Sequence, residues 1–514
     1  AAARLLADHA FSLTLDGQAR TIEVLVRAFP PGAAADPELA LVRAGSDLLQ
    51  GHLDEAAAHL AVAASYAGTA PPDRRRRLEM AIASLQLWLA RRRGHLAGVV
   101  EQAGLLSAAV TGRCGEEIAL AHDLRAVALM NLGTVEAWSL ALADAERHLR
   151  EGAALAREIG RPYLEVACLT QLGFAPDTGS LATARERCRE AIALAERHGW
   201  GTEPVIAPAL LALAEKMIWT GEFGDGERWL RRTARAVEAD DAPGIRLGLH
   251  LVTGMLHLGR GCPREALEEF RAAARLQPRL ASPLAMGRQL TGWTLATQAR
   301  LGRTGEARAG LAALADDQAG AGEIRNARAV LCLADGDPAG ALAALREVLD
   351  GTAPVTGYAT AVEAQLLAGL ASGALGDRRA AHQSAERALA LAEADRLVLP
   401  FAMTGSRELL EALPRHQTAH AALLTDILDL LAGSSAPMAD RSSPPAESLS
   451  AGELRVLRYL PTNLSRPQIA TELSVSVNTV GTHIRSIYAK LGAEDRSAAV
   501  HRARELRLLS AVRR

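Results

Sequence analysis

The sequence predicts an all-α protein in which a helical-repeat solenoid precedes a small domain of four short helices. Aromatic residues make up only 3% of the 514 residues, and Ala and Leu dominate the apolar residues. These residue types favour closely packed helices over sheets. A unit of roughly 40 residues also recurs through most of the chain, as is typical of solenoids. Helix start and stop signals near the C-terminus indicate the separate small domain.

Residues 1–35 are expected to form a helical lead-in to the solenoid. The sequence begins at Ala1 within an apolar helical pattern, without an N-cap residue or an initiator methionine. We interpret this beginning as the edge of a piece excised from a longer protein.

The repeats are expected over residues 36–432, and three positions define each unit. A glycine supplies a left-handed turn, a small residue five positions later lets two antiparallel helices approach, and a larger apolar residue four positions further fills the space between them. One hairpin cannot bury its own apolar stripe, so the units stack into a solenoid with a concave groove. From Gly179 onward the turn glycines are 42, 40, 41, 34 and 40 residues apart. The units are Gly51/Ala56/Leu60, Gly179/Ala184/Cys188, Gly261/Ala266/Phe270, Gly302/Ala307/Leu311, Gly336/Ala341/Leu345 and Gly376/Ala381, with Gly221/Gly226/Leu230 as a weaker copy.

The repeat pattern is uneven along the chain. The unit from Gly261 to Pro278 resembles a tetratricopeptide repeat, including its terminating proline. The stretch from Gln102 to Arg161 fits the period poorly, and the pattern places no hairpin there. Residues 433–448 are rich in Ser and Pro without apolar periodicity, which predicts an exposed linker that lets the following domain reorient.

Residues 449–514 carry the signals of four short helices. Side-chain groups of capping residues satisfy the free N–H groups of a first helical turn, and a glycine just after a helix stops it. The signals are Ser450 with Glu453 and Ser465 with Gln468 as capping boxes, Ser476 and Asp495 as N-caps, and Gly492 as a stop.

The third of these helices has two unlike faces. Its apolar stripe is expected to pack on Leu454, Leu457 and Leu460 of the first helix and on Ile469, Ala470 and Leu473 of the second; the stripe consists of Val480, Ile484, Ile487, Tyr488 and Leu491. The opposite face carries Asn478, Gly481, Thr482, Arg485 and Ala489. Small residues permit close approach to the DNA major groove, while Asn and Arg reach base edges.

The charge of the two parts differs in sign. Residues 449–514 contain 11 Lys+Arg and 5 Asp+Glu, a net charge of +6, whereas the preceding 448 residues carry −8. Only the C-terminal part is therefore attractive to nucleic-acid phosphates.

Residues 449–509 resemble the helix-turn-helix domain of LuxR-type, or GerE-type, transcription regulators. The resemblance rests on S-x-x-E, L-S-R-P-Q-I-A-T-E-L and S-V-N-T-V-x-T-H-I-R-x-I-Y-x-K-L in the order and spacing of the family. It implies base contacts at Asn478, Gly481, Thr482 and Arg485. It implies phosphate contacts at Ser465, Arg466, Thr479, His483, Ser486 and Lys490, and a dimer seam on DNA at Ala499, Ala503 and Leu506. The family usually has a long polar residue where this chain has Gly481.

The N-terminal run A-A-R-L-L-A-D-H-A-F-S-L-T-L-D-G-Q resembles the segment that follows the STAND-class ATPase of large MalT-like LuxR regulators. The resemblance implies an activator with a helical-repeat sensor, and ATP bound only in an N-terminal part that this sequence lacks. A G-x-x-x-x-G-K-[ST] phosphate loop needs a lysine, and neither Lys216 nor Lys490 stands in that setting. We therefore expect no cofactor in this chain.

The resemblance also implies a small-molecule inducer or a protein partner in the solenoid groove, but the sequence assigns no ligand-binding residue. Core packing is the favoured interpretation of the tryptophans, and ligand stacking the alternative. Likewise, Arg74–Arg77 and Arg91–Arg93 are interpreted as solvated faces in preference to an anion site. The tryptophans are Trp88, Trp138, Trp200, Trp219, Trp229 and Trp293.

The predicted function is a DNA-binding transcription regulator that binds double-stranded DNA as a homodimer or larger assembly. The alternative is a protein-interaction scaffold with a terminal capping bundle. An enzyme is not expected, because the sequence has no H-E-x-x-H metal spacing and no G-x-S-x-G nucleophile motif. Five scattered cysteines without a C-x-x-C pair, and no run of about 18 apolar residues, favour a cytoplasmic protein without a membrane partner.

Overall fold

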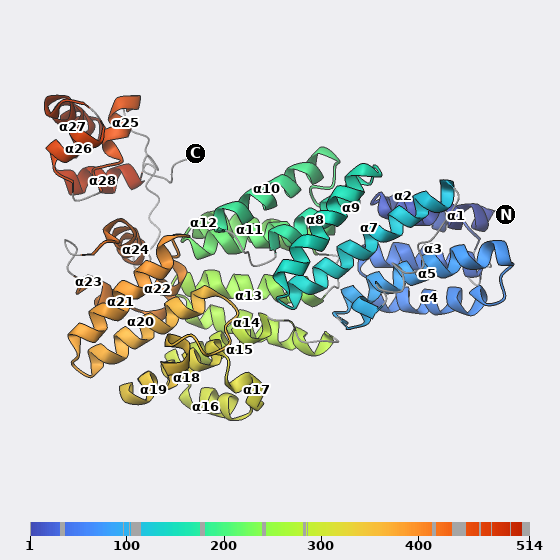
Figure 1. Cartoon of the computed structure of the whole chain (residues 1–514), viewed down its shortest axis with the longest axis horizontal. Helices are drawn as coiled ribbons and strands as arrows, with labels where there is room; N and C mark the ends of the chain where they lie inside the picture. The colour runs from blue at the N-terminus through green and yellow to red at the C-terminus, as the bar shows by residue number, and fades with distance from the viewer. Residues whose placement is uncertain are drawn as a thin grey trace.

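The computed structural model confirms the all-α prediction. Within the described residues every regular element is a helix, and no strand occurs. Helical hairpins follow one another in a curved array, shown in Figure 1. The structure describes residues 2–30, 36–95, 97–101, 103, 115–174, 180–238, 243–280, 284, 286–413, 418–433, 449–461, 464–473, 475–493 and 495–505.

The repeat part is built mainly from antiparallel helix pairs. After α1 (Ala2–Leu15) and α2 (Ala19–Arg27), its helices are α3 (Pro37–Gln50), α4 (Leu53–Ala67), α5 (Pro72–Arg92), α7 (Gly115–Trp138), α8 (Leu142–Glu158), α9 (Pro162–Phe174), α10 (Leu181–Arg197), α11 (Ala207–Trp219), α12 (Phe223–Ala236), α13 (Pro243–Gly259), α14 (Pro263–Leu276), α15 (Met286–Arg300), α16 (Thr304–Ala312), α18 (Gly322–Ala334), α19 (Pro338–Leu349), α20 (Tyr358–Ala374) and α21 (Arg378–Glu393). Shorter elements are η2 (Pro204–Ile206), η3 (Gln277–Arg279), α17 (Asp316–Ala319), α22 (Leu399–Thr404) and α23 (Arg407–Glu411), and α24 (Ala421–Gly433) ends the array. The predicted linker after residue 433 lies outside the described residues.

The three-position pattern of the repeats is confirmed in the hairpin that begins with α13. Gly261 has a φ of +73°, the left-handed conformation that glycine adopts without strain. Ala266 and Phe270 of α14 are both 0% exposed. A Cβ on Gly254 of α13 would lie 2.3 Å from the Phe270 ring, so the ring needs a glycine opposite it. Gly51, Gly221, Gly302, Gly336 and Gly376 also have positive φ values, whereas Gly179 lies outside the described residues.

The poorly fitting stretch contains a hairpin that the glycine pattern missed. Leu140, between α7 and α8, has a φ of +63° and occupies the position that glycine holds in the other units. The rest of the pattern is present, because Ala145 and Leu149 follow at the expected spacing and are 0% exposed. Because the left-handed turn of this unit is formed by a leucine, a pattern that begins with glycine does not identify the α7–α8 hairpin.

The last helices of the array do not only stack on the preceding hairpin. The chain around α22 also returns to contact α11, in the middle of the array. The N–H of Val398, just before α22, donates a hydrogen bond to the carbonyl of Trp219 at the end of α11, with an N···O distance of 2.8 Å. Asp395 accepts a hydrogen bond from the backbone N–H of Leu181 at 2.8 Å. The helix α22 itself lies near α13 and α20, as can be followed in Figure 1. This return encloses a large apolar core.

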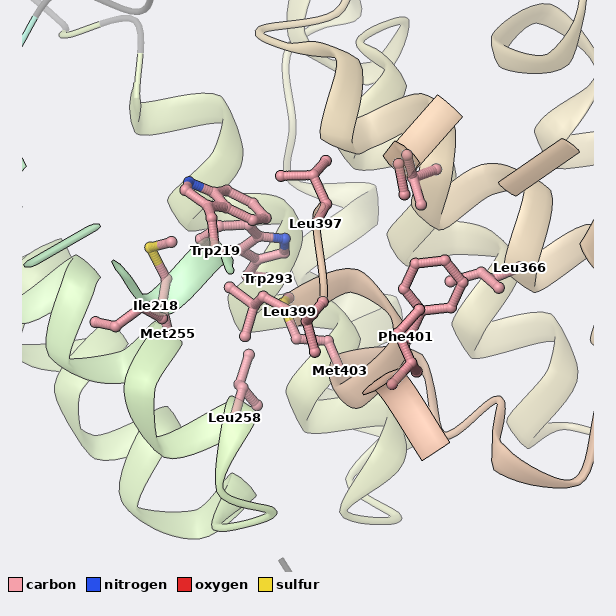
Figure 2. Packing of buried hydrophobic residues seen from close by; sticks show 14 of the residues in the cluster. Ile218, Trp219, Met255, Leu258, Trp293, Leu366, Leu397, Leu399, Phe401 and Met403 are labelled. Atoms are coloured by element: carbon pink, nitrogen blue, oxygen red, sulfur yellow. The ribbon is translucent and has the colours of Figure 1, made fainter. Parts of the chain in front are cut away.

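Two tryptophans are part of that core, as the favoured interpretation predicted. Trp219 and Trp293 are 8% and 4% exposed, and their ring centroids are 5.9 Å apart. Leu399 and Phe401 of α22 are both 0% exposed. Figure 2 shows the two indole rings near Leu399, and Phe401 near Leu366 of α20.

Arg74, by contrast, does not lie on a solvated face. Its guanidinium is buried and forms ion pairs with Asp8 of α1 and Glu38 of α3. A second arginine, Arg161, binds Asp16 at 2.8 Å and Asp123 at 2.9 Å. Buried or partly buried arginines need such partners to offset the loss of hydration. These two arginines join the lead-in helix α1 to α3, α5 and α7.

A buried carboxyl between α15 and α20 makes the stability of the repeat part depend on pH. Glu363 accepts a hydrogen bond from Trp293 Nε1 at 3.2 Å, and burial raises its pKa to about 7 against the charge of Arg300. The folded state thus holds this proton more tightly than the unfolded state. Its stabilising effect is complete below pH 4.5 and is lost as the pH rises towards 7.

Glu363→Gln is therefore expected to stabilise the repeat part at pH 8, by about 2–3 kcal/mol, and to have little effect at pH 4.5. Urea unfolding followed by tryptophan fluorescence at both pH values measures this, because every tryptophan lies in the repeat part. The exposed Glu265→Gln is the matched control. Equal stabilisation at both pH values would contradict the assignment.

Candidate nucleic-acid interface

The C-terminal domain has its own apolar core and consists of α25 (Ala451–Leu457), α26 (Arg466–Glu472), α27 (Val477–Leu491) and α28 (Arg496–Glu505). The predicted stripe of α27 is confirmed as its centre. Val480 and Ile487 are 0% exposed, and Tyr488 packs on the same cluster while partly exposed. The expected partners from the first two helices are Leu454, Leu457, Leu460, Ile469, Ala470 and Leu473, and all contribute to the cluster.

The capping signals that position α26 and α27 are present in the structure. Gln468 Oε1 accepts hydrogen bonds from both the backbone N–H and the hydroxyl of Ser465, each at 2.8 Å. Ser476 Oγ accepts from the Thr479 N–H at 3.0 Å at the start of α27. Gly492 ends α27 with a φ of +63°, and Asp495 accepts from the Ala498 N–H at 2.7 Å. These bonds fix where α27 begins and ends, and thus which of its side chains point outward.

The outer face of α27 presents the four predicted base-contacting positions. Asn478, Thr482 and Arg485 are exposed. A Cβ placed on Gly481 would meet no atom within 4 Å, so this position is open. Together the four positions form an exposed polar surface that has no side chain at Gly481, and we call this surface the α27 outer face.

Two of these side chains are held along the helix. Thr482 Oγ1 donates to the Asn478 carbonyl at 3.0 Å, and Arg485 Nε donates to the Gly481 carbonyl at 3.4 Å. Within the described part of the chain Arg485 forms no ion pair. Its charge therefore remains available to an acceptor outside the protein.

The residues predicted to contact phosphate differ in exposure and in the side of α27 on which they lie. Ser465, Arg466 and Thr479 are exposed around the start of α26 and α27. His483 is half-buried, and a Cβ on Gly452 would lie 3.1 Å from its Cε1 atom. The remaining two, Ser486 and Lys490, point to the other side of α27.

Ser486 and Lys490 bind Glu453, the last residue of the first capping box. The Ser486 hydroxyl donates to Glu453 Oε1 at 2.6 Å, and Lys490 Nζ lies 3.0 Å from Oε2. The Ser450 N–H also donates to Oε2, at 2.6 Å. In this structure both side chains join α25 to α27, an arrangement that the sequence pattern did not indicate.

These donors strongly favour the ionised form of Glu453. The Ser486 hydroxyl, aided by the Ser450 N–H and Lys490, lowers the pKa of the Glu453 carboxyl to about 2, although its burial opposes the shift. A lowered pKa stabilises the folded domain above the unfolded-state value of 4.5, and this stabilisation is lost as the pH falls towards 2.

Glu453→Gln is expected to destabilise the C-terminal domain by about 2–3 kcal/mol at pH 7, because the variant loses charge-assisted hydrogen bonds. Hydrogen exchange of the whole chain, resolved by peptide, should become faster in α25 and α27 and stay unchanged in the repeats. Glu472→Gln, on the exposed surface of α26, is the matched control. Unchanged exchange in α25 and α27 would contradict the structural role of Glu453.

Arg496 is a structural residue that sequence analysis missed. Its guanidinium donates to the carbonyls of Tyr459, Leu460 and Leu464 at 3.1, 2.8 and 2.9 Å. These carbonyls lie in the connection between α25 and α26, so Arg496 ties α28 to that connection. An arginine directly after an N-cap aspartate has no pattern of its own that would reveal this role.

The predicted dimer seam on α28 requires a correction. Ala499 and Ala503 are 0% exposed and belong to the core of the domain itself. A second copy cannot contact side chains that the domain's own helices cover, so other residues of α28 would have to form a seam. Leu506, the third predicted seam residue, lies outside the described residues.

Comparisons with known proteins agree with the geometry of this domain. Residues 447–503 match the family model described as "Bacterial regulatory proteins, luxR family". Two relatives are each named "Probable transcriptional regulatory protein NarL", from Mycobacterium tuberculosis strains CDC 1551 / Oshkosh and ATCC 25618 / H37Rv, and are 44% identical over 80 residues. The match covers 16% of this chain and 37% of the length of those relatives.

A solved structure is similar to the repeat part in fold. The crystal structure of a Rap protein complexed with Competence and Sporulation Factor matches with a TM-score of 0.50 and 11% identity. The match covers 70% of this chain and 98% of the Rap chain. It supports the helical-repeat fold class.

Two other features, a metal site and a membrane-spanning helix, are absent among the described residues. No group of three or more His, Cys, Asp or Glu side chains is placed to hold a metal ion. None of the described helices has the length and apolar character needed to cross a membrane.

Proposed function

We propose that this chain, whose C-terminal domain belongs to the LuxR family, is a DNA-binding transcription regulator with a helical-repeat sensor. The observation that carries the proposal is the α27 outer face, where Asn478, Thr482 and Arg485 stand exposed on a helix whose opposite side is the domain core. A net charge of +6 on residues 449–514 favours approach to DNA.

In the proposed complex α27 enters the major groove. Asn478 binds adenine and Arg485 binds guanine, since these side chains match the paired donors and acceptors of those bases. Gly481 adds no readout of its own and lets the helix backbone approach the base pairs closely. Thr482 contributes a hydroxyl and a methyl group, and the methyl suits a thymine C5-methyl contact.

Phosphate contacts are proposed for the residues that surround this face. Ser465, Arg466 and Thr479 are exposed near helix N-termini, where backbone N–H groups also attract anions. His483 follows Thr479 by one turn of α27. Ser486 and Lys490 reach phosphate only if their bonds to Glu453 are shared or exchanged, so we expect them to contribute less.

Regulation is proposed to come from the repeats. A ligand or partner protein bound there would change association of the chain, and two C-terminal domains held together gain effective concentration on paired half-sites. An activating role, and an ATPase part of the MalT-like type in a longer protein, are parts of this proposal that rest on the resemblance of the sequence.

The proposal is tested by selecting duplexes from a random-sequence pool with the whole chain. We expect a short enriched sequence, arranged as two half-sites, whose binding weakens with added salt. Enrichment of no sequence over repeated rounds would favour the interaction scaffold instead.

A further inference from the structure

A cavity of about 110 Å³ lies between successive hairpins of the repeat part, away from the C-terminal domain. It is lined by α1, α3, α5, α7 and α9, by η2 and the start of α11, and by the first residues of α13 and α15. An apolar cavity of ~150 Å³ accommodates benzene. This smaller cavity can therefore enclose at most a flat ring, and the rest of a larger molecule would extend toward the side where the cavity opens.

Aromatic and apolar side chains form most of the wall. Trp88 of α5, Trp138 of α7 and Tyr163 of α9 contribute their rings, and Met130 and Met286 their thioethers. Tyr163 is held from behind by Trp200, with ring centroids 5.0 Å apart in an edge-to-face arrangement. Rings held in this way suit a flat apolar ligand.

Two uncharged side chains of this wall each have a buried polar atom without a partner within the described structure. Gln171 of α9 is 5% exposed, and its Oε1 atom accepts no hydrogen bond. The buried Nε1 atom of Trp88 donates none. Folded proteins satisfy nearly all such groups, so an unpartnered one in a cavity wall is suited to a polar group of a ligand, a water molecule or an ion.

The other polar side chains of the wall differ from these two. The hydroxyls of Thr14 and Thr170 donate to carbonyls of their own helices, at 2.8 and 3.0 Å. They already have partners, so they need none from a ligand. Among the uncharged side chains of the wall, the unmet demand is thus one hydrogen-bond donor for Gln171 and one acceptor for Trp88.

The charged residues of the wall are basic only. Arg91 and Arg92 line the cavity, and no aspartate or glutamate does so among the residues described. Arg91 Nε donates to Asn131 Oδ1 at 2.7 Å, which holds the arginine in place. This charge disfavours a cationic ligand and favours a neutral or anionic one.

We propose that this cavity is a binding site for a small neutral or anionic molecule with one aromatic ring system, an N–H or O–H donor and a hydrogen-bond acceptor. The ring would lie among Trp88, Trp138 and Tyr163, the donor would bind Gln171 Oε1, and the acceptor would bind Trp88 Nε1. Because the wall spans several hairpins, a bound ligand stabilises one arrangement of the repeats. The inference that this molecule is the ligand of the sensor rests on the proposed regulatory function. The inference that the cavity binds such a molecule does not.

The experiment is calorimetric titration of the whole chain with three probes of the same ring system: indole-3-acetate, indole and tryptamine. We expect indole-3-acetate, which has both the donor and the acceptor, to bind most tightly. Indole has only the donor and should bind more weakly, and tryptamine should bind at least tenfold more weakly than indole-3-acetate. No binding of any probe at millimolar concentration would overturn the proposal. Tryptamine binding as tightly as indole-3-acetate would overturn its charge preference.

Variants locate the site. Gln171→Met keeps the size of the side chain but removes the acceptor, and Ala167→Phe fills the cavity; each is expected to weaken indole binding at least tenfold. Gln86→Met, the same change on the exposed face of α5, should leave binding unchanged. Circular dichroism confirms that each variant is folded. Wild-type affinity in both folded cavity variants would place the probe elsewhere and contradict the proposal.

DNA binding separates this inference from the proposed function. If no probe binds but the chain still selects a DNA sequence, the cavity site is wrong and the regulator stands. If indole binds through Gln171 and no DNA sequence is selected, the cavity site stands and the regulator is wrong.

Discussion

Replacing Asn478 and Arg485 together with alanine is expected to abolish sequence selection by the chain while leaving its fold intact. Each well-placed contact of this kind contributes ~1–3 kcal/mol of discrimination, so the double variant should lose at least about 30-fold in affinity for a selected site. Both side chains are exposed and neither packs in the domain core, so the helices should form as before. Fluorescence anisotropy with the selected duplex and with a scrambled duplex measures the effect.

The matched control for this experiment is Arg458→Ala. Arg458 is also an exposed arginine of the C-terminal domain, at the end of α25, and its loss lowers the net charge equally. We expect the control to weaken binding to both duplexes slightly and to keep the preference for the selected one. Retention of that preference by the double variant would show that the α27 outer face does not read DNA.

Phe401→Ala is expected to destabilise the repeat part by ~3–5 kcal/mol, the cost typical of removing a buried aromatic ring. Phe401 is 0% exposed and belongs to the core that α22 shares with α11, α13 and α20. The space left by the missing ring should weaken the packing of α22 against the middle of the array. Trp219 and Trp293 lie in the same core, so urea unfolding followed by tryptophan fluorescence reports on it directly.

Leu391→Ala is the appropriate control, because Leu391 is 44% exposed at the end of α21. Its replacement should change the free energy of unfolding by less than about 0.5 kcal/mol. A loss of stability in Phe401→Ala no larger than in this control would mean that the return of α22 contributes little to the fold.

Local signals in the sequence predicted hairpins that carry the three-position pattern, but not the left-handed turns at Gly160, Gly199 and Gly351, where the pattern is absent. The pattern works because a left-handed turn, a close approach and a filled gap are all local requirements, as Gly261, Ala266 and Phe270 illustrate. It failed at Leu140, where a leucine instead of a glycine adopts the left-handed conformation. It also could not predict the return of α22, since the hydrogen bond from Val398 to Trp219 joins residues far apart in the chain.

The candidate interface was predictable to a similar extent. Helical periodicity separated the buried stripe of α27 from its outer face, because both depend on spacing within one helix. Contacts between helices were not predictable in this way. Glu453 binds Ser486 and Lys490 across the domain, and the outward-seeming alanines Ala499 and Ala503 are covered by the other helices.

The measurement that tests the central claim most directly is the salt dependence of DNA binding by the whole chain and by residues 449–514. We expect both to bind duplex DNA, with affinity falling at least roughly tenfold between about 50 and about 200 mM salt as phosphate contacts release counterions. Binding by residues 449–514 but not by the whole chain would mean that the repeats inhibit the domain until their ligand binds. Failure of both to bind at low salt would contradict the claim that this is a DNA-binding protein.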